Sequence, residues 1–121
     1  MSMGIETRLG EEIGRYLDLA TSQIKLTAAN MANLDTPGYR AEGMDFEAEM
    51  REALAGVDGG SPPRPVRVRP VDGLIARPDG NDVSMDREGL NLAEAQLKFK
   101  TGVALLREQN QMVMDAIHAD K

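Results

Sequence analysis

Apolar residues recur every three or four positions through the first third of the chain. The steps average about 3.5 residues, which is the repeat of a helix that packs lengthwise against another helix. We therefore predict an N-terminal helix over residues 1–34; an ordinary helix of a small bundle is the alternative interpretation of the same period. The apolar row consists of Leu9, Ile13, Leu17, Ala20, Ile24, Ala28, Met31 and Leu34.

The last third of the chain has the same period. We predict a second long helix over residues 86–118, with Asp86 as its N-cap. Gly102 falls within its apolar row, where the glycine either admits a closely packed neighbour or is simply tolerated at a cost of about 1 kcal/mol relative to Ala. The row consists of Leu92, Ala95, Phe99, Gly102, Leu106, Gln109, Val113 and Ile117, and Leu105, Met112 and Ala116 widen it.

The two matching rows predict a mainly α fold. We expect the two long terminal heptad helices to pair as an antiparallel helical hairpin or coiled coil. The chain has 121 residues, which is one domain at most, so we expect a single rod-like domain over residues 1–121. Because their apolar residues are mostly small or aliphatic, each helix alone is expected to be marginal in water and to become ordered on packing against copies or partners.

A sharp break ends the first helix. Pro37 cannot donate a backbone hydrogen bond, and it pushes the preceding residue out of the helical region. Gly38 follows, and the pair suits the two central positions of a type II turn. The short side chains of Asn33 and Asp35 are expected to bond to the freed backbone at the helix end. We predict a turn over residues 35–41.

The middle of the chain differs from both ends. A short helix is predicted over residues 44–55 with Asp45 as its N-cap, followed by a loop-rich, partly extended segment over residues 56–85. Residues 62–65, Pro-Pro-Arg-Pro, favour an extended loop, and a ligand for an SH3-type groove is the weaker alternative. Residues 79–82 are predicted to form a turn rather than a calcium loop, because the later ligands are missing.

Charge is unevenly distributed along the middle segment. The net charge of −6 argues against nucleic acid as a partner. Most of the acidic excess lies in residues 42–58, and residues 64–77 carry a series of arginines. We expect the acidic stretch to be a solvated face rather than an acid–base pair. The acidic and basic stretches are expected to pair within or between subunits.

The sequence lacks the residues that most catalytic and metal sites need. It contains one histidine, His118, and no cysteine, so it can form neither a catalytic triad nor a zinc site of thiolates and histidines. It also has no glycine-rich phosphate loop. We predict that the protein is not an enzyme and that it has no cofactor, no metal and no small-molecule substrate.

No apolar run approaches the roughly 20 residues that a transmembrane helix needs. Residues 1–14 contain three glutamates and lack the hydrophobic core of a secretory signal peptide. We therefore expect no transmembrane segment, and we expect any export to follow a route other than a cleaved signal.

One stretch of the sequence is specific. Residues 29–40, Ala-Asn-Met-Ala-Asn-Leu-Asp-Thr-Pro-Gly-Tyr-Arg, resemble the signature of the bacterial flagellar rod and hook axial proteins, with Met31 at a position that is usually Ile or Leu. The small size of the chain and residues 45–46, 80–88 and 92–100 resemble a proximal-rod member of that family in particular. The signature residues of the turn are Asn30, Asn33, Thr36, Pro37, Gly38 and Tyr39.

The resemblance implies a function that composition does not. Such a protein is a structural subunit of the proximal rod of the flagellar basal body, polymerises through its terminal helices and transmits motor torque. It is exported by the flagellar type III apparatus without a cleaved signal peptide and lies in the periplasmic rod. Its partners are copies of itself, other rod and basal-body axial proteins, and the export apparatus. The expected assembly seam consists of Leu9, Ile13, Leu17, Ile24, Leu92, Phe99, Leu106, Val113 and Ile117.

A soluble helical adaptor or an export-chaperone-type binding module is the alternative function. Such a module would bind one partner stoichiometrically and would not form filaments.

Overall fold

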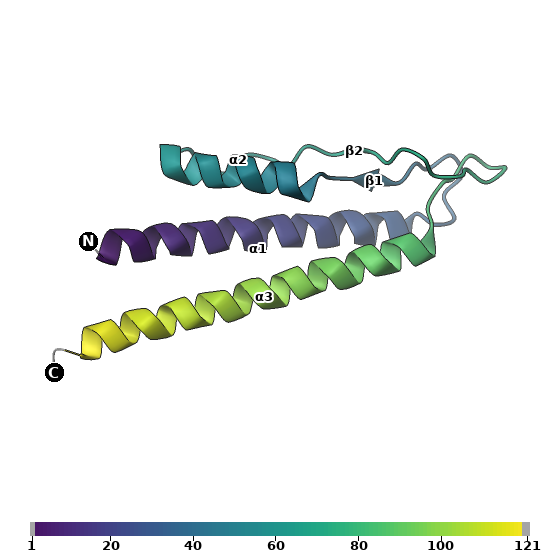
Figure 1. Cartoon of the computed structure of the whole chain (residues 1–121). Helices are drawn as coiled ribbons and strands as arrows, with labels where there is room; N and C mark the ends of the chain where they lie inside the picture. The colour runs from purple at the N-terminus through teal and green to yellow at the C-terminus, as the bar shows by residue number, and fades with distance from the viewer. Residues whose placement is uncertain (1, 120–121) are drawn as a thin grey trace.

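The computed structural model describes residues 2–119 of the chain. Helix α1 is the central element of the fold. Helix α3 runs antiparallel to it along one side, and α2 packs along another side of its N-terminal half (Figure 1). The prediction of a mainly helical fold with paired, antiparallel terminal helices is confirmed. The elements are α1 (Ser2–Ala32), β1 (Glu42–Gly43), α2 (Phe46–Gly59), β2 (Arg69–Pro70) and α3 (Met85–His118).

Small residues occupy the middle of the α3 side of the interface with α1. The buried positions of α3 are Glu88, Ala95, Gly102 and Gln109, which recur once per heptad. A Cβ atom placed on Gly102 would lie 2.5 Å from Cδ2 of Leu17, so the missing side chain is what lets α1 approach here. Of the two interpretations of Gly102, close approach of a neighbouring helix is therefore the correct one.

Helix α2 is held against α1 by an aromatic pair. The rings of Tyr16 and Phe46 meet edge to face, with their centroids 5.7 Å apart, a favoured aromatic geometry. Lys98 of α3 places its Nζ 3.9 Å from the centroid of the Phe46 ring. The same Nζ donates a hydrogen bond of 3.2 Å to Oε1 of Gln23. This lysine therefore links all three helices.

The C-terminal ends of α1 and α2 differ from the predicted ends. Helix α1 ends at Ala32 rather than residue 34, because turn hydrogen bonds replace helical ones there. Helix α2 continues to Gly59 rather than ending at residue 55. Its end is set by Gly60, which has φ of +72°, and by Ser61, whose N–H donates to the carbonyl oxygen of Gly56 at 2.7 Å. This is the left-handed cap that glycine supports.

One of the two predicted N-caps is confirmed and the other is wrong. Asp45 caps α2 as predicted, since its Oδ1 accepts a hydrogen bond of 3.1 Å from the backbone N–H of Ala48. The prediction that Asp86 caps α3 is wrong. Ser84 is the N-cap, and its Oγ accepts from the N–H of Arg87 at 3.3 Å. Asp86 lies in the first turn of α3, where a negative charge interacts favourably with the helix dipole.

The segment between α2 and α3 is extended for most of its length. Arg69–Pro70 pairs antiparallel with Glu42–Gly43, but two residues of ladder are too few to hold a segment in place. Its position therefore depends on side-chain contacts. None of the helices within residues 2–119 combines the length and the apolar character that crossing a membrane requires.

Candidate functional site

The chain reverses direction at the end of α1, in a region that we call the joint: residues 30–41 together with residues 77–88. All six predicted signature residues lie in it. The reversal is closed by a hydrogen bond of 3.2 Å from the N–H of Tyr39 to the carbonyl oxygen of Thr36. Gly38 has φ of +76°, as the third position of a type II turn requires. The predicted turn is therefore present, and its two central residues are exposed.

Two signature side chains close the end of α1. Nδ2 of Asn33 donates to the carbonyl oxygen of Ala29 at 2.8 Å, which confirms the predicted role of Asn33 at the helix end. Oγ1 of Thr36 donates to Oδ1 of Asn33 at 3.0 Å. These bonds satisfy groups that the end of a helix otherwise leaves to water.

The other wall of the joint comes from residues 79–82. Asn81 is fully buried, and its Nδ2 lies 2.8–3.0 Å from the carbonyl oxygens of Asn33, Leu34 and Thr36. The two hydrogens of one amide are thus shared among three carbonyl groups at the end of α1. The predicted turn at residues 79–82 gave no indication of this contact, because a turn pattern is local and the capped helix is distant in sequence.

Asn30 is the centre of the joint and is 1% exposed. Its Oδ1 accepts from the hydroxyl of Tyr39 at 3.2 Å and from the N–H of Glu42 at 3.0 Å. Its Nδ2 donates to the carbonyl oxygen of Glu42 at 2.9 Å and to Oε1 of Glu88 at 2.5 Å. All four hydrogen-bonding positions of the amide are therefore occupied. Helix α1, the outgoing chain and the first turn of α3 meet at this side chain.

Glu88 is a buried carboxylate, 1% exposed, and its Oε2 accepts from Nη1 of Arg87 at 2.8 Å. Burial of Tyr39 raises its pKa above the usual value, and the negative charges of Glu42 and Glu88 raise it further by smaller amounts. Its phenol therefore stays protonated at neutral pH and donates to Asn30. Sequence reasoning missed Glu88, because a glutamate in the first turn of a helix is ordinarily exposed.

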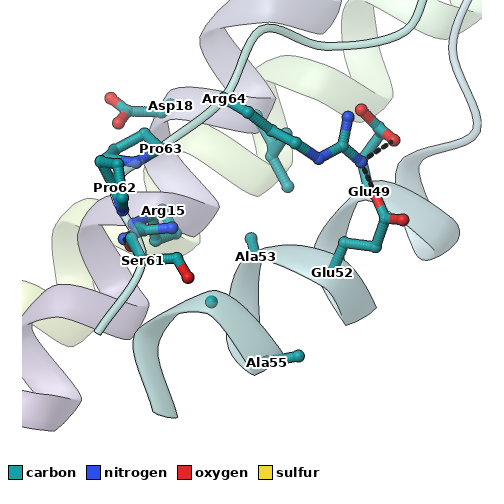
Figure 2. A pocket seen from close by; sticks show the side chains of 12 residues that line it. Arg15, Asp18, Glu49, Glu52, Ala53, Ala55, Ser61, Pro62, Pro63 and Arg64 are labelled. Atoms are coloured by element: carbon teal, nitrogen blue, oxygen red, sulfur yellow. Dashed lines mark hydrogen bonds and ion pairs between the residues drawn. The ribbon is translucent and has the colours of Figure 1, made fainter. Parts of the chain in front are cut away.

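A second polar cluster, the arginine clamp (Glu49, Glu52, Arg64 and Arg67), holds the middle segment against α2. Oε1 of Glu49 accepts from the N–H of Arg67 at 3.0 Å, and Oε2 accepts from the guanidinium groups of Arg67 and Arg64 at 3.0 and 3.2 Å. Glu52 pairs with the same two arginines. Figure 2 shows Arg64 reaching from the middle segment toward Glu49 and Glu52. The predicted pairing of the acidic and basic stretches therefore occurs within one chain.

Glu49 contradicts the expectation of a solvated acidic face, because it is 5% exposed. Its burial is tolerated because each carboxylate oxygen has a donor. Burial raises the pKa of Glu49, but the hydrogen bonds from Arg67 and Arg64 outweigh that effect and hold the pKa below its usual value. The carboxylate is therefore charged at neutral pH.

An open pocket of about 400 Å³ lies beside the clamp, between α1, α2 and the middle segment (Figure 2). Nη2 of Arg15 donates to the carbonyl oxygen of Ser61 at 2.7 Å across it. Charges of both signs line the pocket, including Arg15, Asp18 and Glu52, so its wall does not favour a ligand of one charge.

The predicted assembly seam is divided between the inside and the outside of the chain. Ile13 is buried, whereas Leu9, Phe99 and Ile117 are 40%, 39% and 52% exposed. The remaining members are half-buried: Leu17, Ile24, Leu92, Leu106 and Val113. The seam is thus not a single buried row, and part of it is available to a partner.

Large apolar side chains are concentrated on the outside of α3. Of the eleven large hydrophobic residues exposed in the described part of the chain, eight lie on this helix. We call four of them the outer row, since they follow each other along α3 at steps of seven or eight and lie outside its four buried positions. The outer row consists of Leu90, Leu97, Leu105 and Met112, which are 46–66% exposed.

The joint and the clamp are structural in their chemistry. Their polar groups bind one another and the backbone, and within residues 2–119 no group of three or more acidic or histidine side chains is arranged to hold a metal ion. His118 lies exposed in the last turn of α3. The joint holds α1, the outgoing chain and α3 in fixed positions, and the clamp holds the middle segment against α2.

Paired terminal helices, a signature turn at their junction and exposed apolar side chains along α3 are the features of a structural protein of the flagellar axial class. No family model matches the chain. The flagellar basal body rod protein FlgB of Salmonella typhimurium is 34% identical over 119 residues, covering 84% of this chain and 86% of that protein. FlgB of Escherichia coli K12 is 30% identical, covering 85% and 88%, and FlgB of Cereibacter sphaeroides is 29% identical, covering 97% and 98%. The chain belongs to the FlgB family of flagellar basal body rod proteins.

Proposed function

We propose that this chain is a structural subunit of the proximal rod of a flagellar basal body and that it joins neighbouring subunits through the outer row of α3. The observation that carries the proposal is the exposure of large apolar side chains along that row. Extended apolar surface on a small protein is typical of a protein–protein interface. Family membership supports the choice of the rod, since the FlgB relatives are named as basal body rod proteins.

The intramolecular packing supports the same proposal. Helix α3 turns its small residues Ala95 and Gly102 toward α1 and leaves leucine and methionine outside. A chain that folded only for itself would gain more by burying its larger apolar groups, because the free energy gained rises with the apolar area buried. The outer row is therefore suited to contacts with copies of this chain and with other axial proteins of the rod.

Contacts between unlike surfaces of successive subunits generate a helical tube when the rotation between subunits does not close into a ring. In such a tube the α1–α3 hairpin carries torque along the rod axis, and the joint fixes where the middle segment leaves the hairpin. The proposal places the protein in the periplasmic part of the basal body and makes the flagellar export apparatus a transient partner. Its role is structural rather than catalytic.

The experiment combines Leu97→Asp with Leu105→Asp in a motile host that carries no other copy of the gene. Both side chains are exposed, so we expect normal helicity in the purified subunit by circular dichroism. We expect the variant to be absent from purified basal bodies and the cells to lose motility, because two carboxylates cannot be buried in an apolar contact.

The matched control combines Ala93→Asp with Gln96→Asp, which adds the same charge at exposed positions of the same helix without removing a large apolar side chain. We expect this control to enter basal bodies. Wild-type incorporation of the Leu97 and Leu105 variant would overturn the assigned surface. Absence of the wild-type chain from basal bodies, with a stoichiometric complex in its place, would favour the adaptor.

A further inference from the structure

The packing between α1 and α3 repeats itself along the hairpin. A Cβ atom placed on Gly10 would lie 3.4 Å from the amide of Gln109, and one heptad further along both helices Leu17 meets Gly102. Ala95 and Gly102 are both small and both buried. A slip by one heptad, about 10 Å along the axis, would therefore bring similar surfaces into contact. Packing of the small residues alone does not select one register.

The polar contact in the joint is not repeated. Glu88 is the one charged residue among the buried positions of α3, and its Oε1 lies 2.5 Å from Nδ2 of Asn30. Asn30 is itself held in place, because its other three hydrogen bonds go to Glu42 and Tyr39 of the outgoing chain. The donor to Oε1 of Glu88 is thus available at one level of α1.

A slipped register separates the two groups. It leaves Oε1 of Glu88 without its donor, while Oε2 keeps Arg87 of the same helix, and it leaves one amide hydrogen of Asn30 unpaired. A buried carboxylate oxygen or amide hydrogen that loses its hydrogen-bond partner is unfavourable. A single buried polar contact of this kind fixes register in coiled coils whose apolar contacts would allow several.

We propose that Glu88 is the positioning residue that fixes the register of α3 on α1, through its hydrogen bond to Asn30. The register sets the position of the outer row along the hairpin axis relative to the joint. The importance of that position for assembly rests on the proposed function. The register itself does not, because it is measured on the isolated chain.

The chain contains no cysteine, so spin labels attach only where cysteines are introduced. We place them with Lys25→Cys and Glu108→Cys, two exposed positions on α1 and α3, and measure their separation by pulsed electron paramagnetic resonance. Asn81 also links the loop before α3 to the end of α1, because its Nδ2 donates to the carbonyl oxygens there. The measurements are therefore made with the natural loop and with Asn81→Ala.

With Asn81→Ala alone we expect a single distance, because Glu88 still holds the register. Adding Glu88→Met is expected to produce a second distance that differs by about 10 Å, one heptad of helix. Glu88→Gln in its place retains an acceptor for Asn30 and is expected to restore the single distance. Glu94→Met is the matched control at an exposed position of the same helix, and it is expected to leave the distance unchanged.

Two results would overturn the proposal. One is a single native distance in the variant that combines Asn81→Ala with Glu88→Met. The other is loss of helix in the Glu88→Met variants of both backgrounds without a second distance, which would show that Glu88 contributes stability and not register.

Discussion

Replacement of Glu49 by glutamine tests whether the arginine clamp holds the middle segment. The carboxylate accepts from the N–H, Nε and Nη2 of Arg67 and from Nη2 of Arg64. Glutamine keeps one carbonyl acceptor but loses the charge. Since the segment has a ladder of only two residues, we expect Glu49→Gln to release residues 61–68 while the α1–α3 hairpin stays folded.

The magnitude follows from the bonds that are lost. Hydrogen bonds to a charged group contribute about 1.5–3 kcal/mol each. The side chains of Arg64 and Arg67 are 44% and 61% exposed, so water replaces part of what they lose. We take the local loss as about 1.5–2 kcal/mol, which raises the open population about 10- to 30-fold.

Trypsin reports this opening at one bond. Between Arg51 and Arg87 the basic residues are Arg64, Arg67, Arg69 and Arg77, and all except Arg67 precede proline. Because trypsin does not cut before proline, Arg67–Val68 is the bond that becomes available. Cleavage follows the open population when opening is fast relative to cutting, so we expect the rate at this bond, followed by mass spectrometry, to rise about 10- to 30-fold.

Glu47→Gln is the matched control, because Glu47 is an exposed carboxylate on the same helix. It should leave cleavage at Arg67–Val68 unchanged. Cutting within α3 monitors unfolding of the hairpin. If Glu49→Gln is cut at Arg67–Val68 at the wild-type rate, the clamp does not hold the segment.

The arginine clamp is expected to weaken at low pH, when Glu49 becomes protonated. Its hydrogen bonds hold the pKa of Glu49 below the usual value despite burial. A carboxylate with a lowered folded pKa contributes stability that is present above its unfolded pKa and lost as pH falls through the folded pKa. We therefore expect the amide signal of Arg67 in NMR spectra to change below about pH 4.3, the usual value for glutamate, and the change to be absent in Glu49→Gln.

Two further predictions concern the helix contacts. Gly102→Ala should lower the free energy of unfolding by about 1–3 kcal/mol, because the new Cβ atom meets Leu17 in a packed interface. Gly89→Ala is the control, since Gly89 has open space around it. It should raise the free energy of unfolding by up to about 1 kcal/mol. Equal denaturation midpoints for the two variants would contradict the close approach of α1 at Gly102. Lys98→Met should weaken the docking of α2 by about 0.5–1 kcal/mol, measured by hydrogen exchange in α2. Lys100→Met, at an exposed site, should leave exchange in α2 unchanged. Equal exchange in the two variants would show that the contact of Lys98 with Phe46 does not hold α2 in place.

The sequence predicted what depends on local chemistry. The period of the apolar residues predicted both long helices, Pro37 and Gly38 predicted the turn, and Asp45 predicted a cap. Local rules failed where two signals lay close together. Ser84 and Asp86 are both acceptable N-caps, and the structure uses the earlier one.

The buried polar residues were beyond sequence reasoning for a different reason. Glu49, Asn81 and Glu88 belong to residue types that are usually exposed, and each is buried because of donors or acceptors far away in the sequence. Nothing near them in the chain indicates those partners. The acidic and basic stretches predicted that pairs would form, but not which carboxylate would be buried.

The apolar row of α3 shows why a helical period predicts a seam without predicting its partner. The period identifies positions that prefer to leave water, and it does not distinguish a contact within the chain from a contact between chains. In this fold the small residues Ala95 and Gly102 face α1, while larger ones such as Leu97 and Met112 remain outside. Small residues let two helices approach closely but bury little area, so the hairpin alone gains only modest stability. The larger apolar groups contribute only when another surface covers them. A subunit with this division is therefore expected to gain much of its stability on assembly.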